Sequence, residues 1–358
     1  MNRKKNRKVM SLPKLILLDI LLVGVILLIF ASFHHVIPAI ISERERLEAM
    51  EHTVPATDAP ETEAPTQPEE TIAATEGENS GTEAPTEPDN RTDWQKKFED
   101  QFSDEVEITE NSYRSPEVSI TLQTISTGEG SSKITYHIAD IYVASLDNFT
   151  TYTANNEMRY FGTQDVMEMD AAANAILSLS GDFLTYQKGG FLMRNGEVYA
   201  ATTNLKSICV LYSDGSLVTY EPGEYNIDDV IAAGAVQVWS FGPPLLDENG
   251  KVKEHYDVST AVSYPNPRSA IGYFEPGHYC FVLVDGRQEG YSKGMKISEL
   301  AKVFEDLGCT TAYNLDGGGS AVMVYNHERY SQQSNGGDRA LGDILVIRDS
   351  YYTTQEEE

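Results

Sequence analysis

Cysteine is scarce in this sequence of 358 residues, which contains only Cys209, Cys280 and Cys309, each in an apolar run. Three cysteines are too few and too scattered for a disulfide scaffold, and none is spaced with histidine as in a zinc site. We therefore expect three buried, reduced cysteines, with a single disulfide and a leftover thiol as the alternative.

Basic residues are also scarce, with 27 Lys and Arg against 55 Asp and Glu and a formal net charge of -28. A chain this acidic has no general attraction for nucleic acid, so none is expected as a partner. The few bases are unevenly placed, because residues 1–14 hold six of them and no acid. This asymmetry indicates a membrane.

Residues 15–33 form an almost uninterrupted apolar run of 19 residues, long enough to cross a bilayer as a helix. Asp19 lies near the end where the basic tail begins, so its carboxylate can stay at the headgroups. We expect a cytoplasmic tail (1–14), a transmembrane signal anchor in the lipid bilayer (15–33) and an extracellular C-terminal domain at the cell membrane. A cleaved signal peptide is the competing interpretation, but its apolar region is usually about 7–15 residues long.

Residues 34–92 are predicted to be a juxtamembrane segment followed by a disordered stalk. TEAPT occurs at 62–66 and again at 82–86, and residues 51–93 carry twelve acids and one Arg. So few large apolar side chains cannot offset the entropy of ordering the chain. The segment therefore reads as a spacer.

From residue 93 to about 350 the composition is typical of one globular domain, with an acidic tail at 351–358. Strands are expected at 118–125, 133–145, 191–193, 197–199, 207–212, 279–284, 309–315 and 322–325, and helices at 166–176 and 298–307. Asn-Gly at 195 and Asp-Gly at 214 predict hairpin turns. Strands outnumber helices without regular βαβ alternation, so we predict an α+β fold around one mixed, mainly antiparallel sheet with flanking helices.

The sharpest local feature is NLDGGGS at 314–320, where a predicted strand ends in an acid, three glycines and a serine. Consecutive glycines are costly to order, which indicates unusual backbone angles or a closely approaching ligand. The free N–H groups after Asp316 and the Ser320 hydroxyl suit an anion bound beside a carboxylate. A tight structural turn explains the same residues equally well.

Other polar residues follow predicted strands or glycine-rich turns. Arg268 lies in NPRSAIG, Asp285 and Arg287 form DGR after an apolar strand, and Arg339 follows SNGGD. Arginine matches two phosphate oxygens at once, so these residues are candidates for an anion pocket, although a single loop arginine is more often a surface charge.

The sequence also resembles a known family. SGDF (180–183), FGPPLLDENG (241–250), NPRSAIG (266–272), LVDGR (283–287), KISELAKVFEDLGCTTAYNLDGGGS (296–320) and DRALGDILVI (338–347) occur in the order found in phosphodiester glycosidases. The family usually has Asn-Gly at the position of Ser180-Gly181, two hydroxyl residues after the glycines where this chain has Ser320-Ala321, and Glu-Arg-Ser or Glu-Arg-Thr at the position of Asp338-Arg339-Ala340.

The resemblance implies an extracytoplasmic hydrolase that cleaves a sugar-1-phosphodiester in a cell-envelope glycan or exopolysaccharide. The alternative is a non-catalytic protein that binds phosphate-containing wall polymers. The resemblance implies Asp316 as the leading catalytic acid, with Asp285 or Asp182 second. It implies a substrate-binding set of Arg268, Arg287, Arg339, Gly317, Gly318, Gly319 and Ser320. No cofactor is expected; a divalent cation at Asp316 stays open, since no ligand set has calcium spacing.

Overall fold

A computed structural model describes residues 89, 91–157, 162–184, 189–334 and 337–352. The predicted basic tail, membrane span, nearly all of the stalk and most of the acidic tail lie outside these residues. Within them, no helix has the length and apolar character needed to span a membrane. The chain divides into two units at Ala84–Pro85, and all described residues belong to the second.

A seven-stranded sheet forms the largest layer, in the order β1-β2-β3-β4-β13-β12-β14. Its inner strand β13 is apolar from Tyr279 to Val284 because both of its faces are covered: Tyr279, Phe281 and Leu283 face one core cluster, and Cys280, Val282 and Val284 face another. The strands are β1 (Glu107–Ile108), β2 (Ser112–Arg114), β3 (Val118–Thr127), β4 (Ile134–Val143), β12 (Arg268–Glu275), β13 (His278–Val284) and β14 (Thr311–Asn314).

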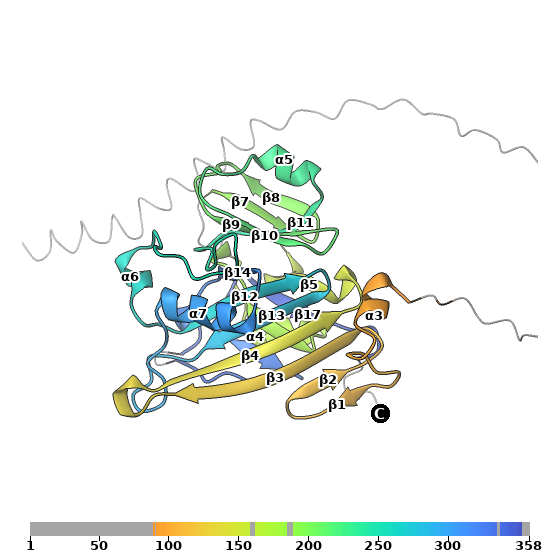
Figure 1. Cartoon of the computed structure of the whole chain (residues 1–358), viewed down its shortest axis with the longest axis horizontal. Coiled ribbons are helices and arrows are strands. Elements are labelled where there is room, and N and C mark those ends of the chain that lie inside the picture. The colour runs from red at the N-terminus through yellow and green to blue at the C-terminus, as the bar shows by residue number, and fades with distance from the viewer. Residues whose placement is uncertain (1–88, 90, 158–161, 185–188, 335–336, 353–358) are drawn as a thin grey trace, which may run out of the picture. The chain divides into compact units, whose positions relative to one another are not determined.

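Two five-stranded sheets complete the β structure, in the orders β10-β9-β11-β7-β8 and β16-β15-β6-β17-β5. Figure 1 shows the first of these, with helix α5, standing apart from the long β3–β4 hairpin. The strands are β5 (Phe149–Thr153), β6 (Leu177–Ser180), β7 (Phe191–Arg194), β8 (Glu197–Ala201), β9 (Ile208–Tyr212), β10 (Leu217–Tyr220), β11 (Ala235–Trp239), β15 (Met323–Tyr325), β16 (Glu328–Arg329) and β17 (Asp343–Ile347).

Helices are few and short in the described residues. The longest, α7, begins after Lys296 rather than after the predicted cap Ser298, and it ends at Gly308, whose positive φ of 84° suits a residue without Cβ. Its Leu300 and Phe304 pack against β13 in an apolar cluster. The helices are α3 (Asp93–Lys97), α4 (Val166–Ala173), α5 (Ile227–Ala232), α6 (Thr260–Ser263) and α7 (Ile297–Leu307), with 3-10 turns at Gly130–Ser132, Leu146–Asn148, Ala154–Asn156 and Gly318–Ser320.

The α+β class with few helices is confirmed, but the single mixed sheet is wrong: the described strands form three sheets. Every strand pairing in them is antiparallel. Both predicted hairpins are present, β7–β8 around Asn195-Gly196 and β9–β10 around Asp214-Gly215. One apolar cluster contains residues from all three sheets, including Phe281, Leu345 and Trp239, so the sheets share a core.

Candidate active site

The strand ends that carry the predicted site residues meet at one place. Arg268 begins β12 opposite Val284, the last residue of β13, so Arg268 and Asp285 lie at the same sheet edge. The Leu315 N–H donates to Ser269 O, which brings Asp316 beside them. A 2.6 Å contact between the hydroxyls of Ser180 and Ser269 joins this edge to the β6 sheet.

The loop after β14 requires two of its three glycines. Gly318 has φ of 66°, and a Cβ there would lie 3.0 Å from Nη2 of Arg287. A Cβ on Gly317 would lie 2.5 Å from Pro267 O. The loop is thus pressed between the NPRSAIG segment and the DGR arginine, while Gly319 is far less crowded.

Asp316 is the predicted catalytic acid, and its carboxylate lies within this loop at only 7% exposure. Oδ1 accepts from the Gly317 N–H at 2.9 Å, and Oδ2 lies 3.5 Å from Nη1 of Arg339. Burial raises the pKa of Asp316, while Ser320 and Arg339 act in the opposite direction. The side chain therefore suits proton transfer or the positioning of water.

Arg339 and Arg287 approach the glycine loop from different segments. Nη1 of Arg339 donates to Ser320 Oγ at 3.3 Å, its backbone N–H donates to Gly319 O, and its guanidinium lies 5.8 Å from the ring centroid of Phe183. Arg287 is exposed, and its guanidinium donates to Asn266 Oδ1 at 2.9 Å. Arg287 holds a left-handed φ of 60°, unusual for a side chain of this size. Both cations are open to an anion at this loop.

Arg268 is held differently from the other two arginines. Its side chain is buried and donates to the backbone carbonyls of Met295, Val262 and Tyr264. Burial, and secondarily the charge of Arg287, lowers its pKa to about 10. These contacts point to a role in bracing the segment before β12, and phosphate binding by Arg268 stays a prediction.

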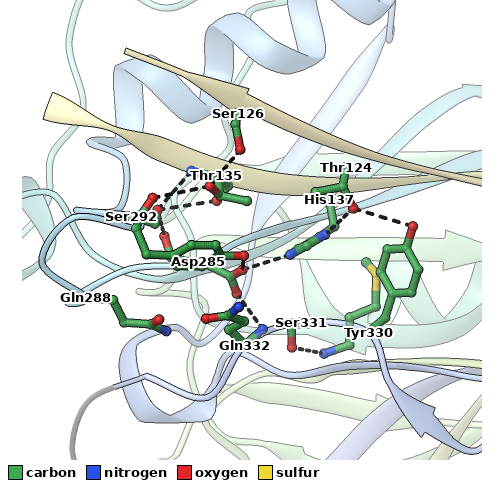
Figure 2. Close-up of polar contacts among 12 residues, drawn as sticks. Thr124, Ser126, Thr135, His137, Asp285, Gln288, Ser292, Tyr330, Ser331 and Gln332 are labelled. Atoms are coloured by element: carbon green, nitrogen blue, oxygen red, sulfur yellow. Dashed lines mark hydrogen bonds and ion pairs between the residues drawn. The ribbon is translucent and has the colours of Figure 1, made fainter. Parts of the chain in front are cut away.

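Asp285 is enclosed by donors, as Figure 2 shows. Its Oδ2 is 2.8 Å from both His137 Nε2 and the Tyr291 hydroxyl, and its Oδ1 accepts from the Gln332 N–H at 3.0 Å. The side chain is fully buried. Asp285 thus ties β4 to the chain that precedes SNGGDR, and this arrangement gives its carboxylate a structural task.

Asp182 belongs to a buried cluster that the sequence did not reveal. Arg194 lies between two carboxylates, with Nη2 2.9 Å from Asp182 Oδ1 and Nε 2.8 Å from Asp343 Oδ2, and all three side chains are fully buried. Asp182 also accepts from the Ser240 N–H at 2.7 Å. A Cβ on Gly181 would collide with the Asp343 carboxylate, which explains the glycine of SGDF. Asp343 lies in DRALGDILVI, one of the segments that resemble the family, whereas Arg194 is followed only by an ordinary Asn-Gly hairpin turn.

This cluster contacts the site through the backbone. The Asp316 N–H donates to Gly181 O. The negative charge of Asp182 contributes to raising the pKa of Asp316, and that of Asp316 contributes to raising the pKa of Asp343. Asp343 has its pKa raised to about 7, mainly by burial, with Arg194 opposing. Asp182, Asp316 and Asp343 therefore lie close enough to affect one another, and Arg194 is the buried cation between Asp182 and Asp343. Among the described residues, no group of three or more His, Cys, Asp or Glu is arranged to hold a metal ion.

The chain is similar to known proteins in sequence and in fold. Residues 173–348 match the family model described as phosphodiester glycosidase. The chain is 28% identical over 197 residues to the SPbeta prophage-derived uncharacterized protein YomE of Bacillus subtilis, covering 52% of this chain and 30% of that protein. It is 25% identical over 169 residues to N-acetylglucosamine-1-phosphodiester alpha-N-acetylglucosaminidase of Mus musculus, covering 43% of this chain and 32% of the enzyme.

A solved structure shares the fold. The catalytic domain of the zebrafish N-acetylglucosamine-1-phosphodiester alpha-N-acetylglucosaminidase, auto-inhibited by its pro-peptide, superimposes with a TM-score of 0.53 at 20% identity, covering 68% of this chain and 88% of that one. This chain spans about a third of the length of the two curated relatives, so their whole activities do not transfer directly. The family match nevertheless includes Asp182, Asp285, Asp316 and Arg339. Residues 173–348, close to half of the chain, therefore match the phosphodiester glycosidase family.

Proposed function

We propose that this chain hydrolyses a sugar-1-phosphodiester, releasing the sugar and leaving a phosphomonoester. The observation that carries the proposal is the position of Asp316, whose buried carboxylate lies on a glycine loop. Arg287 and Arg339 both approach this loop, and the loop lies within the residues that match the family. A phosphate monoester is a good leaving group, so neutralising its charge lowers much of the barrier.

Different residues bind the phosphate, act at the glycosidic bond and position the loop. Arg339 and Arg287 bind the phosphate over the glycine loop, since Arg339 bonds to Ser320 and Arg287 lies against Gly318. Asp316 orients the attacking water or moves a proton at the glycosidic bond. Asp182 and Asp343 hold Arg194 behind the loop and so fix Gly181, the backbone partner of Asp316.

We further propose that the substrate is a glycan of the cell envelope or an exopolysaccharide, reached from outside the cytoplasm. The support is the order of basic tail, apolar run and acidic stalk along the first 92 residues. In this arrangement the bilayer anchors the protein through residues 15–33, and the domain projects toward the polymer.

A non-catalytic binding protein for phosphate-containing wall polymers is the second candidate. One observation favours it: Ser180, at the position where the family usually has asparagine, is fully buried and bonded to Ser269, so it does not face a ligand.

Turnover separates the two functions. The protein is incubated with N-acetylglucosamine-1-phosphate esterified to a simple alcohol, and both free sugar and phosphomonoester are quantified. We expect release by the wild type and a loss of roughly 10²- to 10⁴-fold in kcat for Asp316→Asn, with binding of an unreactive analogue largely kept. Asp306→Asn, an exposed acid on α7, is the control that retains activity. Binding without release would favour the second candidate, and neither binding nor release across a panel of sugar phosphodiesters would contradict both.

A further inference from the structure

Two of the three cysteines lie side by side. Cys280 on β13 and Cys309, two residues after the end of α7, have Sγ atoms 3.6 Å apart, and both residues are buried in the same apolar cluster. Cys209 lies in the other large core cluster, with residues from all three sheets. The fold thus selects one pair out of three cysteines.

The backbone around this pair is fixed from both sides. The Cys309 N–H donates to Phe304 O across the Gly308 cap, so the end of α7 determines where the Cys309 side chain begins. Cys280 has register partners on both β4 and β12. A Cβ on its β12 partner Gly272 would lie 2.7 Å from Cys280 Sγ and 2.6 Å from Phe304 Cδ1. Glycine at 272 therefore leaves room for the sulfur next to the helix.

The separation of the sulfur atoms is close to that of a covalent bond. An S–S bond measures about 2.05 Å, so closing the gap from 3.6 Å needs a movement of about 1.5 Å, within reach of small side-chain rotations. A buried thiol has no stronger partner in this cluster, which is otherwise apolar. A bond here would replace two thiols without displacing a packed side chain.

We propose that Cys280 and Cys309 form a structural disulfide when the chain folds in an oxidising compartment, while Cys209 stays a thiol. The thiolate of one cysteine attacks a disulfide donor, such as a disulfide-bonded oxidoreductase, and releases one donor thiol. The thiolate of the second cysteine then attacks the mixed disulfide and releases the other. Two cysteine thiols are oxidised, the donor disulfide is reduced to two thiols, and the protons pass to the donor sulfurs.

The burial of both cysteines in the folded domain limits when this exchange can take place. In the folded domain burial raises the pKa of the Cys280 thiol, and the side chains are out of reach of a donor protein. The exchange therefore occurs before β13 and α7 have packed together, and the finished bond is protected from reductants in the folded state.

The bond would hold in place the segment of the chain that leads into the glycine loop. Cys309 leads directly into β14, whose end carries Asp316, and β13 lies beside β12, the strand that pairs with β14. Figure 1 shows α7 lying beside β12 and β13. A link between Cys280 and Cys309 closes a segment of the chain with a sequence separation of 29 residues. The link restricts the unfolded chain and raises the melting temperature. This inference is independent of the proposed catalytic function.

Thiol counting on the full chain, purified in detergent, tests the proposal. The protein is expressed in an oxidising and in a reducing compartment, denatured, treated with a maleimide and weighed intact. We expect one labelled cysteine after oxidising expression and three after reducing expression, with peptide mapping locating the bond. Cys209→Ser should then show none and two. Cys280→Ser should show two in both cases, and this count holds even if the variant folds poorly.

Melting provides a second readout. The wild type and Cys209→Ser should melt at a higher temperature after oxidising expression than after reducing expression, whereas Cys280→Ser should melt at the same temperature after both. Three labelled cysteines in folded protein from the oxidising compartment would overturn the proposal. A bond that includes Cys209 would overturn it as well.

Discussion

At the scale of single residues, the three arginines of the site differ in what they contact. Arg287 and Arg339 have guanidinium groups at the glycine loop, and Arg339 keeps 44% of its side chain exposed. Arg268 is buried, and its guanidinium donates hydrogen bonds to backbone carbonyls. Residues of one type in neighbouring motifs therefore have different expected effects on binding and on stability.

Replacing each arginine with alanine should separate these effects. Arg287→Ala and Arg339→Ala should weaken binding of a sugar phosphodiester by roughly tenfold or more and change binding of the neutral glycoside little, because a lost phosphate contact discriminates by charge. Calorimetry with both ligands measures this. Arg348→Ala, an exposed arginine at the end of β17, is the matched control. Equal losses for the two ligands would contradict phosphate binding.

Arg268→Ala should act on stability instead. It removes three charge-assisted hydrogen bonds to backbone carbonyls, so we expect a loss of about 2–4 kcal/mol in the free energy of unfolding, measured with urea. A fully stable Arg268→Ala protein with impaired phosphodiester binding would restore the original prediction that Arg268 binds phosphate.

Sequence motifs predict a grouping of Asp316, Arg287 and Arg339 because a glycine run and its neighbouring charges are local features, and the structure places all three at the glycine loop. The motifs do not predict which way a carboxylate faces after a strand. Asp285 and Asp316 both follow apolar strands, yet Asp285 meets His137, which lies 148 residues away in the chain. Arg194 gave no local signal, because its partners Asp182, two residues after β6, and Asp343, on β17, are far from it in the sequence.

At the scale of elements, the positions of the strands were easier to predict than the pairing between strands. The apolar run of β13 and the turns at Asn195-Gly196 and Asp214-Gly215 are local features, and all three were confirmed. The division into three sheets depends on pairings such as β6 with β17, between residues far apart in sequence, for which no short-range pattern exists.

The buried Asp182–Arg194–Asp343 cluster joins strands of two sheets, β7 and β17, and should be costly to break. Arg194→Met leaves two buried carboxylates without their cation, and we expect a loss of about 3–5 kcal/mol in the free energy of unfolding. Urea unfolding at neutral pH measures it. A loss below about 1 kcal/mol would show that Arg194 does not neutralise this cluster.

The same cluster makes stability depend on pH with a definite sign. The pKa of Asp343 is raised from 3.8 to about 7 in the folded protein, so between these values the folded chain holds a proton that the unfolded chain has released. This contribution is complete below about pH 4 and is lost as the pH rises to about 7. Asp343→Asn removes it, so the stability of the variant relative to wild type should increase over this range. A constant difference would contradict the raised pKa.

At the scale of the whole molecule, the folded unit begins before the predicted boundary at residue 93. Thr92 caps α3 by accepting from the Gln95 N–H, and its hydroxyl donates to Ala144 O at 2.8 Å. Trp94 packs against the large core cluster. The cap was missed because the stalk composition, rich in Thr and Glu, continues up to this helix.

Two truncated proteins test this boundary. A fragment starting at Pro85 should unfold cooperatively at the temperature of the full chain, whereas one starting at Asp93 should lose about 1 kcal/mol because it lacks the cap. Thermal unfolding followed by circular dichroism compares them. A non-cooperative transition in the longer fragment would show that residues before Pro85 belong to the folded unit.

The central claim is that water attacks the sugar rather than the phosphorus, and oxygen labelling tests it most directly. Hydrolysis of the sugar phosphodiester is run in water enriched in heavy oxygen, and the phosphomonoester is analysed by mass spectrometry, because a free reducing sugar exchanges its anomeric oxygen with water. Cleavage of the bond between the anomeric carbon and oxygen leaves the phosphomonoester unlabelled, which is the result that our account predicts. Heavy oxygen in the phosphomonoester would mean attack at phosphorus and would contradict the assignment of this site as a glycosidase.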